Sequence, residues 1–203
     1  ERTVSALSLN GHPLEWYKIN DVVMGGHSCS ELRVAASGAL DFSGVISTRD
    51  GGFASCTTIE QPLGLPSNTS AFHVSVTTDG QLYKLTLKVS ESVWEPVWQA
   101  DLPAASLVPS KRHDLLLPIS AFRASRMGST VEGATLEPSR ILSVGINLAL
   151  IDARGNPNLH FRDGPFAISV HALAAHAPAP SASPPMPAPM ARSPSPADVM
   201  RPR

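Results

Sequence analysis

Alternation of apolar and polar residues is the dominant pattern along the first 173 positions of the chain. In residues 83–90 every second side chain is large and apolar, and residues 72–77, 143–150 and 166–171 follow the same rule. A period of two sends successive side chains to opposite faces of a β-strand. These segments are therefore predicted to be strands with one buried and one solvated face, which is typical of antiparallel sheets.

Shorter runs extend this pattern to most of the chain. Asp79-Gly80 separates the runs 72–77 and 83–90, and because Asp-Gly readily takes positive φ angles, it predicts a hairpin between them. No helical periodicity extends convincingly beyond two turns, so the spacing of the strands indicates an all-β antiparallel β-sandwich or barrel. The further strand candidates are Glu31–Val34, Ala39–Ser47, Phe53–Thr58, Val97–Asp101 and His113–Leu117.

Composition changes abruptly near residue 174. Residues 174–203 are mostly Ala, Pro and Ser with very few large apolar side chains. Such a segment buries too little apolar surface to offset the entropy of ordering its backbone. We expect one β-sandwich domain over residues 1–173 and a disordered Pro/Ala/Ser-rich tail with polyproline II character over residues 174–203.

Charge and cysteine content narrow the classes of function. The net charge is −1 and the basic residues are scattered, which argues against nucleic acid as a partner. The longest nearly apolar run, residues 141–151, is far shorter than the ~20 residues that span a bilayer, so contact with a membrane is expected to be peripheral at most. The two cysteines, Cys29 and Cys56, could pair, but two reduced small residues in or near the core are favoured.

The usual catalytic templates are not met. Gly26–Ser30 approaches a nucleophile elbow but lacks its second glycine, and no phosphate-binding loop or paired histidine motif occurs. The aspartates fall mostly in turns and at strand ends, where Asp commonly bonds to backbone amides. We therefore expect a non-enzymatic chain without a cofactor or a metal, although a facing pair of carboxylates, as in glycosidases, stays open.

Two glycine-rich segments are unusually distinctive. Residues 16–30 and residues 42–55 each hold a Gly-Gly pair beside an apolar or aromatic residue and a hydroxyl. Paired glycines allow sharp bends and close approach of another backbone or a ligand. A purely structural interpretation, in which they form turns or bulges at a sandwich corner, is favoured on these residues alone.

Both segments resemble a known family. Trp16…Asn20-Asp21-Val-Val-Met24-Gly25-Gly26-His-Ser28-x-Ser30 is similar to a signature of the complex I intermediate-associated protein 30 family. Phe42-x-Gly44…Gly51-Gly52-Phe53-Ala54-Ser55, the turn Asp79-Gly80-x-x-Tyr83 and the late runs Ile141–Ile146 and Phe166–Val170 resemble further blocks of that family in the same order. Asp50, Cys56-Thr57 and the segment 111–118 depart from the family pattern, which bears on the partner surface more than on the fold.

The resemblance implies a fold, a role and a site. The fold is a jelly-roll sandwich of the galactose-binding-like type, and the role is a protein-binding assembly factor or chaperone for mitochondrial respiratory complex I, whose partners are complex I intermediates or other assembly factors. A mitochondrial location follows from the same resemblance, and no targeting peptide is visible in the sequence. The binding residues implied are Trp16, Asn20, Asp21, Met24, Gly25, Gly26, Ser28, Gly51, Gly52, Phe53 and Ser55.

Met24 and Phe53 are expected to be buried anchors rather than exposed contacts. The alternative function is a carbohydrate-binding module, for which Trp94 and Trp98 are the best candidates for a sugar platform, although core filling is favoured for both. Asn68 begins a glycosylation triplet, which matters only in a secreted chain.

Overall fold

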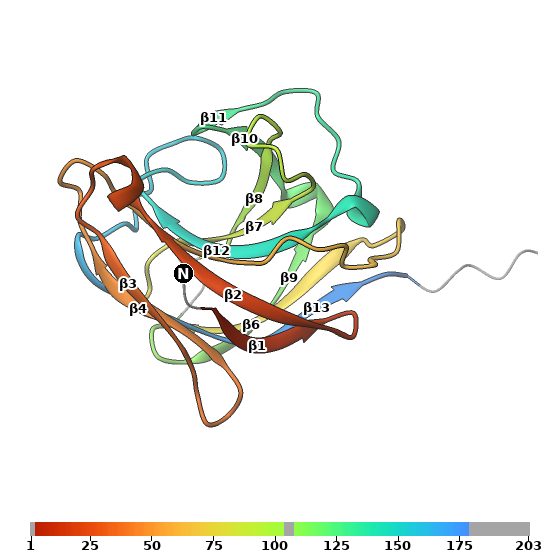
Figure 1. The fold of residues 1–203 in the computed structure, drawn as a ribbon, viewed down its shortest axis with the longest axis horizontal. Coiled ribbons are helices and arrows are strands. Elements are labelled where there is room, and N and C mark those ends of the chain that lie inside the picture. The colour runs from red at the N-terminus through yellow and green to blue at the C-terminus, as the bar shows by residue number, and fades with distance from the viewer. Residues whose placement is uncertain (1–2, 104–107, 179–203) are drawn as a thin grey trace, which may run out of the picture.

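Two antiparallel sheets packed face to face form the protein in a computed structural model, which describes residues 3–103 and 108–178 (Figure 1). The predicted all-β antiparallel sandwich is confirmed. The eight-stranded sheet has the order β1 (Val4–Leu9), β2 (His12–Asn20), β5 (Phe53–Thr58), β12 (Ser143–Ala149), β7 (Tyr83–Lys88), β8 (Val97–Asp101), β10 (Arg123–Arg126) and β11 (Ser129–Thr130). The five-stranded sheet has the order β3 (Cys29–Val34), β4 (Leu40–Ile46), β13 (Gly164–His176), β6 (Ala71–Thr78) and β9 (Arg112–Pro118).

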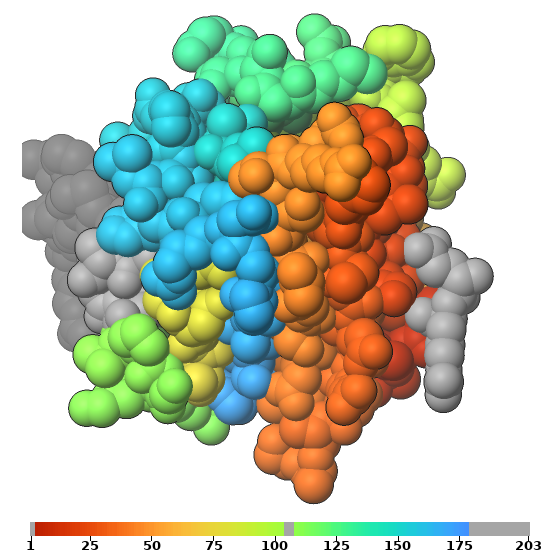
Figure 2. Space-filling model, turned by 90° about the vertical axis from the view of Figure 1, so that its left-hand side faces the viewer, coloured from red at the N-terminus to blue at the C-terminus, as the bar shows by residue number. Residues whose placement is uncertain are grey.

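Figure 2 shows the outer face of the five-stranded sheet, where β6, β13 and β4 run side by side in yellow, blue and orange. Short 3₁₀ turns connect several strands of the two sheets: η1 (Asp21–Met24), η3 (Ile119–Ala121) and η4 (Pro138–Arg140). Neighbouring strands are mostly distant in the sequence, since β13 lies between β4 and β6, and β12 lies between β5 and β7. The fold therefore depends on long-range pairing rather than on successive hairpins.

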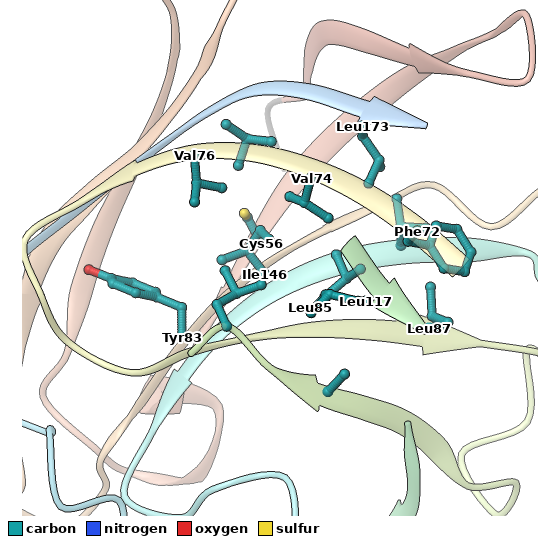
Figure 3. Close-up of a cluster of buried hydrophobic side chains, with 14 of the residues drawn as sticks. Cys56, Phe72, Val74, Val76, Tyr83, Leu85, Leu87, Leu117, Ile146 and Leu173 are labelled. Carbon is teal, nitrogen blue, oxygen red and sulfur yellow. The ribbon is translucent and has the colours of Figure 1, made fainter. Parts of the chain in front are cut away.

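The alternating positions form the core between the sheets. Tyr83, Leu85 and Leu87 of β7 point inward toward Phe72 and Val74 of β6 (Figure 3), and these five side chains are fully buried. The intervening residues of β7 and β6 point away from this core, as the period of two predicts. Each sheet thus has an inner apolar face and an outer, more polar face.

The prediction of a hairpin at Asp79-Gly80 is wrong. β6 pairs with β13 and β9, whereas β7 pairs with β12 and β8, so this turn crosses from one sheet to the other. The Asp79 carboxylate holds the crossing by accepting bonds from Gln81 N (3.0 Å), Tyr83 Oη (3.2 Å) and Ala167 N (3.1 Å). Two alternating strands can bury their apolar faces either as neighbours in one sheet or as members of opposite sheets that face each other across the core. Here the two strands belong to opposite sheets.

The edges of the domain also differ from expectation. β1 and β2 were not predicted, and Trp16 of β2 is fully buried, with its indole N–H donating to Ala6 O over 2.8 Å. β13 continues through His176, three residues past the expected boundary, because residues 174–176 pair with the start of β6. Most of the expected tail, residues 179–203, lies outside the described residues.

Leu87 and Leu116 provide a matched test of this core. Leu87 is fully buried, whereas Leu116 of β9 is 62% exposed on the outer face. We expect Leu87→Ala to lower the free energy of unfolding by about 2–5 kcal/mol, because it removes buried methyl groups and leaves a cavity. Leu116→Ala should change it by less than about 0.5 kcal/mol, as measured by urea denaturation. Equal losses in the two variants would contradict the assignment of the two faces.

Candidate functional site

A buried carboxylate joins the two glycine-rich segments. Asp21, at the start of η1, is fully buried and accepts hydrogen bonds from Ser28 N (2.9 Å) and Ser28 Oγ (2.7 Å) within the first segment. It also accepts bonds from Gly52 N (2.7 Å) and Phe53 N (3.3 Å) of the second segment. Asp21, Ser28, Gly52 and Phe53 are called the Asp21 clasp below.

Close packing against this carboxylate explains one glycine of each pair, Gly26 and Gly51. A Cβ atom at Gly26 would lie 2.3 Å from Asp21 Cγ, and one at Gly51 would lie 2.3 Å from Asp21 Oδ2. Neither position can hold a larger residue without moving the carboxylate. Gly25 closes η1 with a φ of 92°, a conformation that strongly favours glycine.

The clasp keeps Asp21 ionised. Burial by itself raises the pKa of this carboxyl, but the hydrogen bonds from Ser28, Gly52 and Phe53 outweigh it, so the pKa lies below the ordinary value of 3.8. Ser28 also accepts a bond from Ser47 N over 3.0 Å, which ties the first segment to the end of β4. The backbone of both segments is therefore held by one ionised group and its partners.

The clasp presents a rigid apolar projection. Val22, Val23 and Met24 of η1 are 60%, 74% and 73% exposed, although they directly follow a fully buried residue. These three residues are called the η1 ledge below. In Figure 1, η1 lies beside the loop that follows β12. Met24 is therefore not the buried anchor that was expected, whereas Phe53 is half-buried.

A cleft opens on the outer face of the eight-stranded sheet, next to the η1 ledge. Its volume is about 610 Å³, within the range of about 300–1,000 Å³ usual for ligand sites. Figure 1 shows β8, β10 and β11 rising over β12 on this side of the sheet. This sheet cleft is lined by Ile19, Met24, Gly51, Gly52, Phe53, Ser55, Thr57, Lys84, Thr86, Lys88, Val97, Gln99, Ser125, Met127, Gly128, Asn147, Ala149, Leu150 and Ile151.

The floor of the sheet cleft consists of two rows of side chains that cross the strands. The registers of β2, β5, β12 and β7 place Ile19, Ser55, Asn147 and Lys84 in one row. The second row holds Thr57, Thr86 and Gln99, with Gly145 of β12 between Thr57 and Thr86 in the strand register. The long axis of such rows lies across the strands rather than along them.

A buried lysine lies in the lining of the cleft. Lys84 is 3% exposed, and its ammonium donates to Ile151 O over 2.9 Å. Burial lowers its pKa to about 8, against the opposing effect of the nearby Asp101 and Asp152 carboxylates. Asp101 in turn accepts a bond from Ala153 N over 2.9 Å, so Lys84 and Asp101 both fasten the loop after β12.

The lysines of the cleft have acidic neighbours. Lys88 forms an ion pair with Glu60, and Lys84 lies in the field of Asp101 and Asp152. Burial raises the pKa of Asp101, and the Asp152 charge adds to this, whereas backbone bonds from Asn156 and Arg154 outweigh burial and lower the pKa of Asp152. The charged groups of the lining are consequently close to electrical balance, and most of the other lining side chains are apolar or neutral.

The predicted site residues divide into three groups. Met24, Gly51, Gly52, Phe53 and Ser55 line the cleft. Asp21, Gly26 and Ser28 form or contact the clasp behind it, and Gly25 shapes its turn. Asn20 accepts a bond from Ser30 Oγ over 2.6 Å nearby, whereas Trp16 belongs to the core. Their role in binding stays a prediction.

Sequence reasoning missed most of the cleft floor. Lys84, Thr86, Gln99 and Asn147 were visible only as the polar side of alternating strands, which gives no sign of which strands are neighbours. Met127 and Leu150 come from loops without a recognisable motif. Trp98 fills the core as expected, whereas the expectation that Trp94 also does so is wrong, since Trp94 is 69% exposed in the loop before β8; the two rings therefore do not form one sugar platform.

Cys29 and Cys56 are both free. Cys56 lies in the core and burial raises the pKa of its thiol, whereas Cys29 is exposed, contrary to the expectation that both lie in or near the core. In residues 3–103 and 108–178, no three His, Cys, Asp or Glu side chains gather as a metal site would require. No helix in that part of the chain is long and apolar enough to span a membrane.

Comparison with known proteins identifies a family. The sequence model of the complex I intermediate-associated protein 30 family matches residues 7–170, which confirms the resemblance expected from the motifs. No match to a curated protein sequence was found.

Several solved structures are similar in fold to this chain. The family 11 carbohydrate-binding module of the cellulase Lic26A-Cel5E of Clostridium thermocellum is 14% identical, with a TM-score of 0.49, over 79% of this chain and 88% of that chain. The family 11 module of C. thermocellum in complex with a β-1,3-1,4-mixed-linked tetrasaccharide is 16% identical, with a TM-score of 0.47, over 79% and 89%. A family 29 carbohydrate-binding module is 10% identical, with a TM-score of 0.43, over 85% and 82%. At these identities the likeness concerns the fold alone.

Replacing the central carboxylate tests the clasp. In Asp21→Asn the amide nitrogen would face N–H and O–H donors, so we expect the free energy of unfolding at pH 7 to fall by roughly 2–4 kcal/mol. Because the folded pKa of Asp21 is depressed, its contribution is present above the ordinary value of 3.8 and is lost as the pH falls through the folded pKa. The gap between the variant and the parent should therefore narrow in acid, as measured by urea denaturation at several pH values.

Asp50→Asn is the matched control, because the Asp50 side chain is 69% exposed in the same segment. It should leave stability nearly unchanged at pH 7. A similar loss in both variants would contradict the special position of Asp21.

The lowered pKa of Lys84 predicts that the free energy of unfolding rises with pH. The folded pKa of about 8 lies below the ordinary value of 10.5, so between these values the unfolded chain binds more protons than the folded chain. From pH 7.5 to 9.5 the parent should gain about 2 kcal/mol relative to Lys84→Met, by urea denaturation at each pH. Titration of Cys56 and Tyr83 is common to both proteins and cancels in this difference. Lys111→Met controls for the loss of one surface charge, and a pH-independent difference for Lys84→Met would contradict the prediction.

Proposed function

Since the chain belongs to the complex I intermediate-associated protein 30 family, we propose that it is a non-enzymatic assembly factor for mitochondrial respiratory complex I. It binds assembly intermediates, or other assembly factors, through the face that carries the η1 ledge and the sheet cleft. The binding uses no cofactor and no covalent step.

The exposed η1 ledge is the observation that carries this proposal. Three consecutive large apolar side chains, Val22, Val23 and Met24, stand in solvent on a segment whose backbone is held by a buried ion. Exposed apolar surface is costly in water and commonly marks an interaction site. Because the clasp fixes the ledge in advance, little conformational entropy is lost when a partner covers it.

The ionisable groups around the cleft are already engaged in holding the fold. Lys84 bonds to Ile151 O, Asp101 bonds to Ala153 N, and Asp21 is enclosed by its clasp. Ionisable groups held by such bonds stabilise the loops that form the cleft. This use supports binding over acid–base chemistry.

Co-purification tests the proposal. The tagged protein should capture identified complex I subunits from solubilised mitochondria, and the triple variant Val22→Ser, Val23→Ser, Met24→Ser should reduce this capture at least tenfold by quantitative mass spectrometry. The exposed positions make the fold tolerant of these changes.

The matched control carries Val34→Ser and Leu116→Ser, which are 45% and 62% exposed on the five-stranded sheet. It should capture the same subunits as the parent. The proposal fails if no complex I subunit is captured and cells lacking the protein assemble complex I normally.

A further inference from the structure

The floor of the sheet cleft holds polar groups with no partner in the described part of the chain. Within residues 3–103 and 108–178, no side-chain hydrogen bond joins Asn147, Gln99 or Thr86 to another residue, whereas the neighbouring Ser55 hydroxyl donates to Ile146 O over 3.2 Å. All three side chains line the cleft. They are available to a ligand without breaking any bond of the fold.

The side chains of Asn147 and Gln99 carry the same hydrogen-bonding groups as a peptide bond. The side-chain amides of Asn147 and Gln99 each offer a donor and an acceptor, which complement the N–H and C=O of a polypeptide backbone. Asn147 and Gln99 lie two strands apart and one pleat along, which is about 12 Å from strand and residue spacings. An extended chain covers this distance in roughly three to four residues.

The upper lining is apolar and adaptable. Met24 and Met127 are 73% and 79% exposed, and Leu150 is 42% exposed. Unbranched methionine side chains adjust to apolar side chains of different shapes. Among the described residues that line the cleft, Phe53 is the one aromatic residue, and it is half-buried, which suits aliphatic side chains better than stacked sugar rings.

The electrostatics favour an uncharged occupant. Lys88 is paired with Glu60, and Lys84 is balanced by Asp101 and Asp152. A charged side chain brought into the cleft would lose water without gaining an unpaired partner. A neutral segment avoids that cost.

We propose that the sheet cleft binds an extended, uncharged and apolar-rich polypeptide segment that lies across the strands. Its backbone amides pair with Asn147 and Gln99, and its side chains contact Met24, Met127 and Leu150. This inference rests on the proposed protein-binding function and names the kind of segment that is recognised.

Peptide selection against the full chain tests the inference directly. A phage-displayed library of random nonapeptides should yield sequences rich in Leu, Ile, Val and Met without charged residues at their centre. Binding of the strongest synthetic peptide, followed by fluorescence anisotropy, should weaken at least tenfold in the double variant Asn147→Ala, Gln99→Ala, since two hydrogen-bonding side chains are lost. Asn68→Ala, an exposed amide outside the cleft lining, should bind as the parent does.

Recognition of the peptide backbone by the cleft can be tested separately. Replacing one central peptide bond of the selected peptide by an ester removes an N–H donor and keeps every side chain. This replacement should weaken binding several-fold to the parent but not to the double variant. Circular dichroism and thermal melting show whether the variants remain folded.

The inference is overturned if selection yields no peptide or only charged peptides, or if the cleft variants bind the selected peptide as the parent does. It is also overturned if the β-1,3-1,4-mixed-linked tetrasaccharide occupies the cleft while peptides do not. Occupation of the cleft by a synthetic peptide of residues 179–203, or by a second copy of the chain, would overturn it as well. Capture of complex I subunits that is insensitive to the cleft variants would sink this inference and leave the proposed function standing. Peptide binding in the cleft without any complex I subunit in the co-purification would do the reverse.

Discussion

Burial of the Asp21 carboxylate is the constraint on which the η1 ledge and the neighbouring cleft depend. An ionised carboxylate without water is stable only when several donors surround it, and here the donors come from Ser28 and from Gly52 and Phe53, which follow Asp21 by 31 and 32 residues. Meeting that need brings Ser28 and Gly52 to the same point. The close approach leaves no room for a Cβ at Gly26 or Gly51. Gly26 and Gly51 are thus a consequence of the buried charge, whereas Gly25 and Gly52 adopt positive φ angles.

The same carboxylate links the core to the surface. Asp21 follows β2 directly and bonds to the first residue of β5, and these two strands pair in the eight-stranded sheet. The η1 ledge is therefore fixed relative to the floor of the sheet cleft. Val22, Val23 and Met24 are exposed on a turn whose first residue, Asp21, is bonded to both segments. The hydrogen bonds to Asp21 thus hold the turn that carries these exposed apolar side chains.

Sequence periodicity predicted the faces of individual strands well, and the reason is local. Tyr83, Leu85 and Leu87 had to share a face whatever their partners were, and they lie in the core. Strand neighbours could not be predicted in the same way. The turn at Asp79-Gly80 was expected to close a hairpin, but the Asp79 carboxylate bonds to Ala167 of β13, a partner remote in sequence, and the chain changes sheet. The paired glycines were recognised as special, whereas the Asn147, Gln99 and Thr86 floor depends on the order of β12, β7 and β8, which no local pattern contains.

Four aspartates show how this fold uses ionisable groups. Asp21, Asp79, Asp101 and Asp152 all accept bonds from backbone N–H groups, and each holds a turn or a loop at the place where strands end. Lys84 does the complementary task by donating to a carbonyl. Since the charges are consumed by the scaffold, the groups left open in the cleft are neutral amides, hydroxyls and flexible apolar side chains. For the proposed binding function, selectivity at this surface would arise from hydrogen-bond geometry and shape, because a partner with a buried unmatched charge would be rejected by its own desolvation cost.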